Sequence, residues 1–284
     1  MILPKKIDFA IIAPESLLRV FSSQGDCHMA IAPIALDHSF YANYYKQEVS
    51  NGKLVILDNG AFELDKPLST GLLEKALFKT RAQEVVAPDM IGDSSKSLKL
   101  LEEFINQLSS RYLTKVRIQA IIQGHTLEEL ESHYLRLLNN PYVNTIGITH
   151  AFQLVDCFGK TDNRMFSRVM LIDYFRRQHA LGNYPQIYKP LHLMGMTNPI
   201  ELFYQYINNI REPFVRSNDS SAPVQYGRHG YSLDEFGILR EKISQKLDFF
   251  WTPTTTLPGW QWQNIHSIIQ HNVDKLKEFS EGVR

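Results

Sequence analysis

Short apolar or alternating runs recur eight times along this chain, and a segment with helical periodicity separates each run from the next. The repeat averages about thirty residues per strand and helix unit, which suits a (β/α)8 TIM barrel better than an open doubly wound sheet of five or six strands. We therefore expect an α/β chain with a TIM-barrel fold. The expected strands are 7–12, 29–35, 53–58, 84–89, 116–123, 145–149, 191–196 and 214–219.

The segments between these strands predict helices, and several begin with Ser, Thr or Asn, the residue types that cap helix N-termini. The clearest are 70–83, 94–108, 126–140 and 198–210, with a closing helix expected at 232–247. No linker divides the chain, so we expect one domain over 1–284. Its barrel would cover about 5–248, followed by a short helical and aromatic extension at 249–284.

Composition sets broad limits on the class of protein. Hydrophobic residues make up 44% and charged residues 21%, so the chain can bury a sizeable core. Thirty basic residues balance thirty acidic ones, so nucleic-acid binding would need a local basic patch. Cys27 and Cys157 form no CxxC motif, and the amino terminus has no signal-peptide pattern or membrane-length apolar run. We expect a cytoplasmic protein with no membrane partner.

Chemistry in a TIM barrel belongs at the carboxyl ends of the strands. Polar residues gather at these positions, and Asn218 and Asp219 directly follow the strand-like FVRS segment. Carboxylates sharing one concave site raise at least one pKa, which separates acid and base roles. The alternative is that each Asp caps the helix that follows it. The strand ends carry Asp58-Asn59-Gly60, Pro88-Asp89, Gln123-Gly124-His125, Thr149-His150, Gly195-Met196 and Asn218-Asp219.

Five segments in order resemble successive motifs of the tRNA-guanine transglycosylase superfamily, over roughly residues 53 to 230. They are LDNGAFEL (57–64), VVAPDMIGD (85–93), AIIQGHT (120–126), LHLMGMTNPIELF (191–203) and SNDSSAP (217–223). The resemblance implies that Asp219 is a nucleophile and Asp58 a second catalytic carboxylate. It also implies a set of residues at the purine-like base: Asp89, Gln123, Gly124, Gly60, Asn59 and Gly195.

These residue types suit the implied reaction. Exchanging the base of a nucleoside with retention needs two carboxylates that act by double displacement, as in retaining glycosidases. Asp219 would attack the anomeric carbon, and Asp58 would manage the proton of the leaving and incoming bases. Asp89 as acceptor and Gln123 as donor would complement the amide edge of guanine.

The chain also departs from the tRNA enzymes. Those enzymes carry a structural zinc site of three Cys and one His, whereas this sequence has no Cys after Cys157 and no HxH or HExxH motif. We expect no metal and no cofactor. The chain looks more like the zinc-free branch that places 7-deazaguanines in DNA, which includes phage-encoded members. The implied partners are DNA, with tRNA as the alternative, and a free 7-deazaguanine base such as 7-cyano-7-deazaguanine; a homodimer is left open.

A polymer substrate needs basic residues beside the pocket. Arg216 and Arg228 flank Asp219 in sequence, and the segment 158–190 is rich in basic and aromatic residues. A solvated helix face is the alternative for that segment. Its basic residues are Lys160, Arg164, Arg168, Arg176, Arg177 and Lys189.

Three other functions stay open at this point. One is the same exchange reaction on tRNA. Another is a non-catalytic barrel that binds nucleic acid or serves as a partner subunit, although such a protein would be expected to lose an acid and both are present. The last is a phosphate-binding metabolic barrel, for which MGMTNP and NDSSAP are poor phosphate loops.

Overall fold

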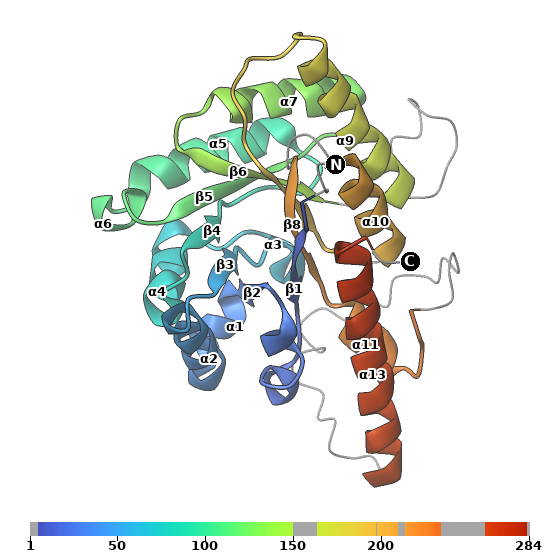
Figure 1. Cartoon of the computed structure of the whole chain (residues 1–284). Helices are drawn as coiled ribbons and strands as arrows, with labels where there is room; N and C mark the ends of the chain where they lie inside the picture. Colours follow the sequence, from blue (N-terminus) through green and yellow to red (C-terminus); the bar gives the residue numbers. More distant parts are fainter. Residues whose placement is uncertain (1–4, 150–163, 197, 210–213, 234–258, 283–284) are drawn as a thin grey trace. The chain divides into compact units, whose positions relative to one another are not determined.

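The computed structural model describes residues 5–149, 164–196, 198–209, 214–233 and 259–282. Eight parallel strands alternate with helices along the chain, which confirms the (β/α)8 barrel class (Figure 1). Their order in the sheet is β1-β8-β7-β6-β5-β4-β3-β2. The strands are β1 (Asp8–Ile11), β2 (Cys27–Ile31), β3 (Leu54–Asp58), β4 (Glu84–Val86), β5 (Arg117–Ile122), β6 (Val143–Thr149), β7 (Leu191–Met194) and β8 (Val215–Ser220).

The chain divides into two compact units, which are described separately. Unit 1 comprises Met1–Met29 with Gly195–Arg284, and unit 2 comprises Ala30–Met194. Among the residues that the structure describes, no helix combines the length and the apolar composition needed to cross a bilayer.

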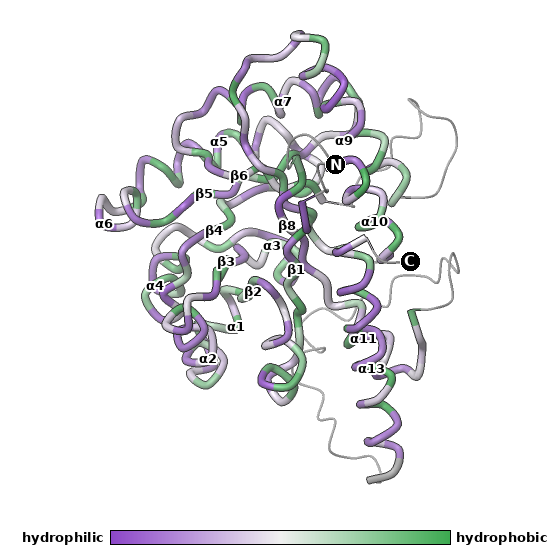
Figure 2. The backbone as a smooth tube through the Cα atoms, viewed as in Figure 1, coloured by the Kyte–Doolittle hydropathy of each residue, from purple (hydrophilic) through white to green (hydrophobic). Residues whose placement is uncertain are grey.

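Unit 2 contains β3 to β7 in parallel register and the helices that connect them. Most of these helices place hydrophobic residues beside hydrophilic ones along their length, as expected for one buried and one solvated face (Figure 2), whereas the short helix at 110–113 buries no residue. The helices of unit 2 are α1 (Ala32–Asp37), α2 (Ser39–Ser50), α3 (Ala61–Leu64), α4 (Thr70–Thr80), α5 (Ser94–Gln107), α6 (Ser110–Leu113), α7 (Leu127–Asn139) and α9 (Arg164–Ala180).

Capping side chains fix where two of these helices begin. Thr126 accepts a hydrogen bond from the Glu129 amide at 3.2 Å at the start of α7. Asp93 accepts one from the Lys96 amide at 2.8 Å at the start of α5. Both caps satisfy amide groups that the first helical turn leaves without a partner, and both helices confirm the expected ranges.

The expected strand at 29–35 was wrong in its second half. Strand β2 ends at Ile31, and α1 begins at Ala32 with Pro33 in its first turn. Proline suits that position because its fixed φ is helical and no helical partner is needed for its nitrogen. An unbroken apolar run does not distinguish a strand from a buried helix.

Unit 1 pairs β1 with β8 in parallel, with Ala10 opposite Asp219. Helix α13 (Gly259–Ser280) packs against α11 (Ala222–Arg228), α10 (Pro199–Asn208) and β1 (Figure 1). Asn272 in α13 donates hydrogen bonds to the carbonyls of Pro223 and Tyr231, at 3.1 and 3.0 Å. Two short 3-10 helices follow β1, at Glu15–Leu17 and Ser22–Gln24. The expected closing helix at 232–247 lies outside the described residues from 234 onward.

Candidate active site

Asp58 is the last residue of β3, and its side chain folds over the turn that follows. It is 8% exposed, and its Oδ2 accepts a hydrogen bond from the Gly60 amide at 2.9 Å. Gly60 has a φ of +75°, and a Cβ on it would lie 2.4 Å from Cγ of Pro33. Only glycine therefore fits this turn, which holds the Asp58 carboxylate at the carboxyl end of β3.

Asn59 connects the end of β3 to the end of β4. Its Nδ2 donates to Oδ1 of Asp89 and to the carbonyl of Ala87, both at 2.7 Å. Its Oδ1 accepts from the Ala61 amide at 2.7 Å. Every polar atom of the Asn59 side chain is thus used inside the protein, so Asn59 positions Asp89.

Gln123 holds Asp89 from the other side. Its Nε2 donates to Oδ2 of Asp89 at 2.6 Å, and its Oε1 accepts from the Gly92 amide at 2.9 Å. Asn59, Asp89 and Gln123 are 1%, 3% and 3% exposed. The ends of three neighbouring strands therefore meet in one buried network, which we call the Asn59–Asp89–Gln123 network.

Burial raises the pKa of Asp89, and the hydrogen bonds from Asn59 and Gln123 oppose that rise. A carboxylate offers about four acceptor positions, and the amides of Asn59 and Gln123 and the main-chain amide of Asp89 itself occupy three of them. Asp89 therefore retains capacity to accept one further hydrogen bond from a ligand.

His133 in α7 contacts the main chain of Gln123 and so supports the Asn59–Asp89–Gln123 network. The sequence analysis did not identify His133. Its Nδ1 lies 3.1 Å from both the main-chain nitrogen and the main-chain oxygen of Gln123, and burial lowers its pKa. The helical spacing of buried Leu130, Tyr134 and Leu137 puts His133 on the same face. That periodicity was the signal that marked it as an inward residue.

Gly124 packs against α7. A Cβ on Gly124 would lie 3.0 Å from Cβ of Glu129 and 3.3 Å from Cγ of Leu130. Gly124 thus allows the end of β5 to approach the first turn of α7 closely. This close packing explains the glycine at position 124 without any contact to a ligand.

In unit 1, Asp219 lies within β8, in agreement with the strand expected at 214–219. Its Oδ1 accepts a hydrogen bond from the Gly195 amide at 3.1 Å, and its carbonyl accepts from the Met196 amide at 2.9 Å. Asp219 is 4% exposed. Gly195 has a φ of +63°, a left-handed conformation that favours glycine. The turn after β7 therefore orients the Asp219 carboxylate.

The residues on either side of Asp219 are also buried. Asn218 donates from Nδ2 to the carbonyl of Asp8 at 3.2 Å, and its Oδ1 has no hydrogen-bond partner among the described residues. Ser220 donates from Oγ to the carbonyl of Met196 at 2.5 Å. These contacts fix the carboxyl end of β8 on both sides of the carboxylate.

The structure thus brings Asp58, Asn59, Gly60, Asp89 and Gln123 together in unit 2. It brings Asp219 together with Gly195 in unit 1. The catalytic pairing of Asp58 with Asp219, which belong to different units, stays a prediction.

The arginines expected near Asp219 are placed differently from one another. Arg216 lies three residues before Asp219 on β8, so alternation along the strand directs the two side chains to opposite faces. Arg228 ends α11, where burial lowers its pKa. The positions of Arg216 and Arg228 in the chain therefore do not place either side chain beside the Asp219 carboxylate.

The basic segment of unit 2 is largely committed to internal contacts. Arg168 is fully buried and donates to the carbonyls of Ile148 and Met194, at 3.1 and 2.7 Å. Lys189 is 8% exposed, and burial lowers its pKa to about 8. These two side chains serve the protein interior and do not form a phosphate-binding surface.

Two further arginines of that segment lie on α9. Arg176 pairs with Asp173 at 2.7 Å, whereas Arg177 is exposed. Lys160 and the side chain of Arg164 lie outside what the structure describes. Only Arg177 of the four described cations therefore stays exposed and available to a polymer.

Within the described residues, no group of three or more His, Cys, Asp or Glu side chains is arranged to hold a metal ion. Comparison with known proteins gives no family whose model matches the chain and no curated protein that matches it. The function must therefore be argued from the site itself.

Proposed function

We propose that this protein is a guanine transglycosylase that exchanges guanine for a 7-deazaguanine base in DNA. The Asn59–Asp89–Gln123 network carries the proposal. It holds a buried carboxylate at the ends of adjacent parallel strands, with an acceptor position left after the hydrogen bonds from Asn59, Gln123 and the main-chain amide of Asp89. An N–H donor, such as one on the amide edge of guanine, complements a carboxylate held in this way.

In the proposed reaction, an Asp219 carboxylate oxygen attacks C1′ of the target nucleotide, and the bond from C1′ to N9 of guanine breaks. Asp58 in its protonated form gives a proton to the leaving guanine. Asp58 then takes the N9 proton of the incoming base, whose nitrogen attacks C1′ and releases Asp219. Two inversions at C1′ give net retention, as in retaining glycosidases.

The fold class supports these roles. Catalytic residues of (β/α)8 barrels come from the carboxyl ends of several different strands. Asp58 ends β3, Asp219 lies near the end of β8, and the Asn59–Asp89–Gln123 network follows β3, β4 and β5. In duplex DNA the target nucleotide must flip out of the stack, at a cost of a few kcal/mol.

The test is incorporation of radiolabelled guanine or a 7-deazaguanine into double-stranded DNA, single-stranded DNA and tRNA. Asp219→Ala should abolish exchange and the covalent protein–DNA adduct seen on a denaturing gel, and Asp58→Ala should cripple turnover. Asp65→Asn is the matched control because Asp65 has a φ of +56°, which Asn tolerates.

Exchange into DNA that survives Asp219→Ala would overturn the nucleophile assignment. Exchange into tRNA alone would support the proposed base-exchange reaction and would show that the substrate is tRNA and not DNA. No exchange into any polymer would favour a non-catalytic nucleic-acid-binding barrel.

A further inference from the structure

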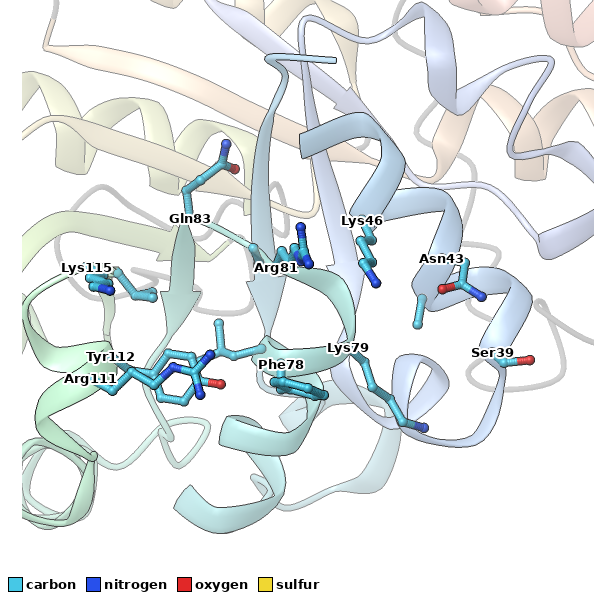
Figure 3. A pocket seen from close by; sticks show the side chains of 14 residues that line it. Ser39, Asn43, Lys46, Phe78, Lys79, Arg81, Gln83, Arg111, Tyr112 and Lys115 are labelled. Atoms are coloured by element: carbon cyan, nitrogen blue, oxygen red, sulfur yellow. The ribbon is translucent and has the colours of Figure 1, made fainter. Parts of the chain in front are cut away.

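A pocket of about 530 Å³ lies in unit 2, away from the Asn59–Asp89–Gln123 network (Figure 3). Helix α2, the end of α4, the turn into β4, helix α6 and the turn into β5 form its walls. These turns lead into the amino ends of β4 and β5, whereas Asp89 and Gln123 follow their carboxyl ends. The length of β5, at about 3.3 Å per residue, separates the two sites by roughly 15 to 20 Å.

The lining of this pocket is strongly basic. It contains five cationic side chains and no Asp or Glu, in a chain whose formal net charge is zero. Figure 3 shows these cations on separate segments around the hollow. Among the described residues, none of the five pairs with a carboxylate. The five are Lys46, Lys79, Arg81, Arg111 and Lys115; we call them the basic pocket.

Hydrogen bonds connect two lining residues of the basic pocket to neighbouring parts of unit 2. Gln83 accepts from the Val55 amide at 2.8 Å and donates to the Lys53 carbonyl at 3.2 Å, which joins the pocket wall to β3. Lys79 donates to the carbonyl of Leu36. Two lining residues, Gln83 and Lys79, are therefore held by contacts inside unit 2 in the ligand-free protein.

Arg81 occupies an unusual position for a charged residue. It is the C-cap of α4 with a φ of +57°, where glycine or asparagine is the ordinary choice. A basic residue also suits the end of a helix dipole, but Lys79 already supplies one in the last turn of α4. A role for the guanidinium in the basic pocket accounts for an arginine at this position.

Aromatic rings complete the lining. Phe78 is 65% exposed, and the Arg111 guanidinium lies 6.0 Å from its ring centroid and 5.6 Å from that of Tyr112. An exposed ring beside unpaired cations is the combination that proteins use to bind single-stranded nucleic acid, because any base can stack on it.

We propose that the basic pocket binds consecutive phosphates of a single-stranded nucleic-acid segment, with a base stacked on Phe78. The cations lie on three separate parts of the chain, which suits phosphates spaced along a backbone. The volume is in the range that accommodates one or two nucleotides. This second site goes beyond the proposed base exchange and does not depend on it.

The test is fluorescence anisotropy of a fluorescein-labelled single-stranded oligonucleotide of about 20 nucleotides, at salt concentrations from about 0.05 to 0.3 M. The pocket variant is Lys46→Gln with Arg81→Asn and Lys115→Gln. Asparagine tolerates the left-handed backbone at position 81. Thermal unfolding checks that the triple variant is folded. If the triple variant does not fold, the single variants Arg81→Asn and Lys115→Gln replace it in the binding assay.

Loss of three phosphate contacts should reduce the slope of log K against log salt by about 2 and weaken binding roughly 100-fold at 0.1 M salt. The matched control removes the same charge from exposed sites outside the pocket: Lys99→Gln, Arg136→Gln and Lys277→Gln. It should change the affinity by less than about threefold. A Phe78→Ala variant should weaken binding by about 10-fold or more with an unchanged salt slope.

Equal losses in the pocket and control variants would overturn the proposal, since binding would then follow net charge alone. Unchanged binding in the pocket variant would also overturn it. Pocket-dependent binding of a nucleoside triphosphate without binding of the oligonucleotide would assign the pocket to a free nucleotide instead. Pocket-dependent binding of the oligonucleotide by a protein that exchanges no base would uphold the basic pocket and overturn only the proposed function, so the two tests fail independently.

Discussion

Gln123 donates a hydrogen bond from Nε2 to Oδ2 of Asp89 over 2.6 Å, and both side chains are 3% exposed. The same Gln123 side chain accepts from the Gly92 amide. One amide therefore fixes both the buried carboxylate and the loop that follows β4. In the ligand-free protein, Gln123 is therefore a positioning residue. The sequence had suggested Gln123 only as a hydrogen-bond donor to a base.

Replacing Gln123 with alanine should lower the free energy of unfolding by about 2 to 3 kcal/mol, because the Gly92 amide and one oxygen of Asp89 lose their partner while buried. Urea unfolding measures this change. Gln107→Ala is the control, since Gln107 is exposed at the end of α5 and should shift stability by less than about 0.5 kcal/mol. Similar losses in both variants would show that the network contributes little to stability.

The raised pKa of Asp89 predicts a pH dependence with a definite sign. The unfolded carboxyl titrates near the ordinary value of 3.8, and the folded one titrates above it. Between these two pH values the folded state binds more protons, so stability should fall as pH rises and then level off above the folded pKa. The free energy of unfolding, measured in urea from about pH 4 to pH 8, should fall more in the wild type than in Asp89→Asn. The opposite slope would mean that the hydrogen bonds outweigh burial.

Much of the barrel was predictable because its signals are local. The periodicity of 94–108 and 126–140 predicted α5 and α7, and Asp93 and Thr126 cap them as single side chains within reach of the next turn. Residues 29–35 were harder, because apolar continuity does not reveal the change from strand to helix at Ala32.

The candidate site was predictable residue by residue but not as a network. Sequence position placed Asn59, Asp89 and Gln123 at strand ends, but their contacts depend on the register of three strands. The burial of Arg168 and Lys189 had no sequence signal, since the carbonyls that they meet belong to other elements. The basic pocket was missed for the same reason: its cations come from distant segments that only the fold collects.

Gly195 provides a test of how Asp219 is oriented. Gly195→Ala puts a Cβ on a residue with φ of +63°, which should cost about 1 kcal/mol of stability and move the amide that donates to Oδ1 of Asp219. Gly230→Ala is the matched control, because Gly230 also lies in unit 1, has a φ of +77° and has open space around its Cβ position. Both variants should lose similar stability in urea unfolding, since the backbone strain is the same. Only Gly195→Ala should also slow base exchange, by about tenfold if displacement of the carboxylate raises the barrier by about 1.4 kcal/mol. Equal effects of the two variants on exchange would show that the Gly195 amide does not orient a reacting carboxylate.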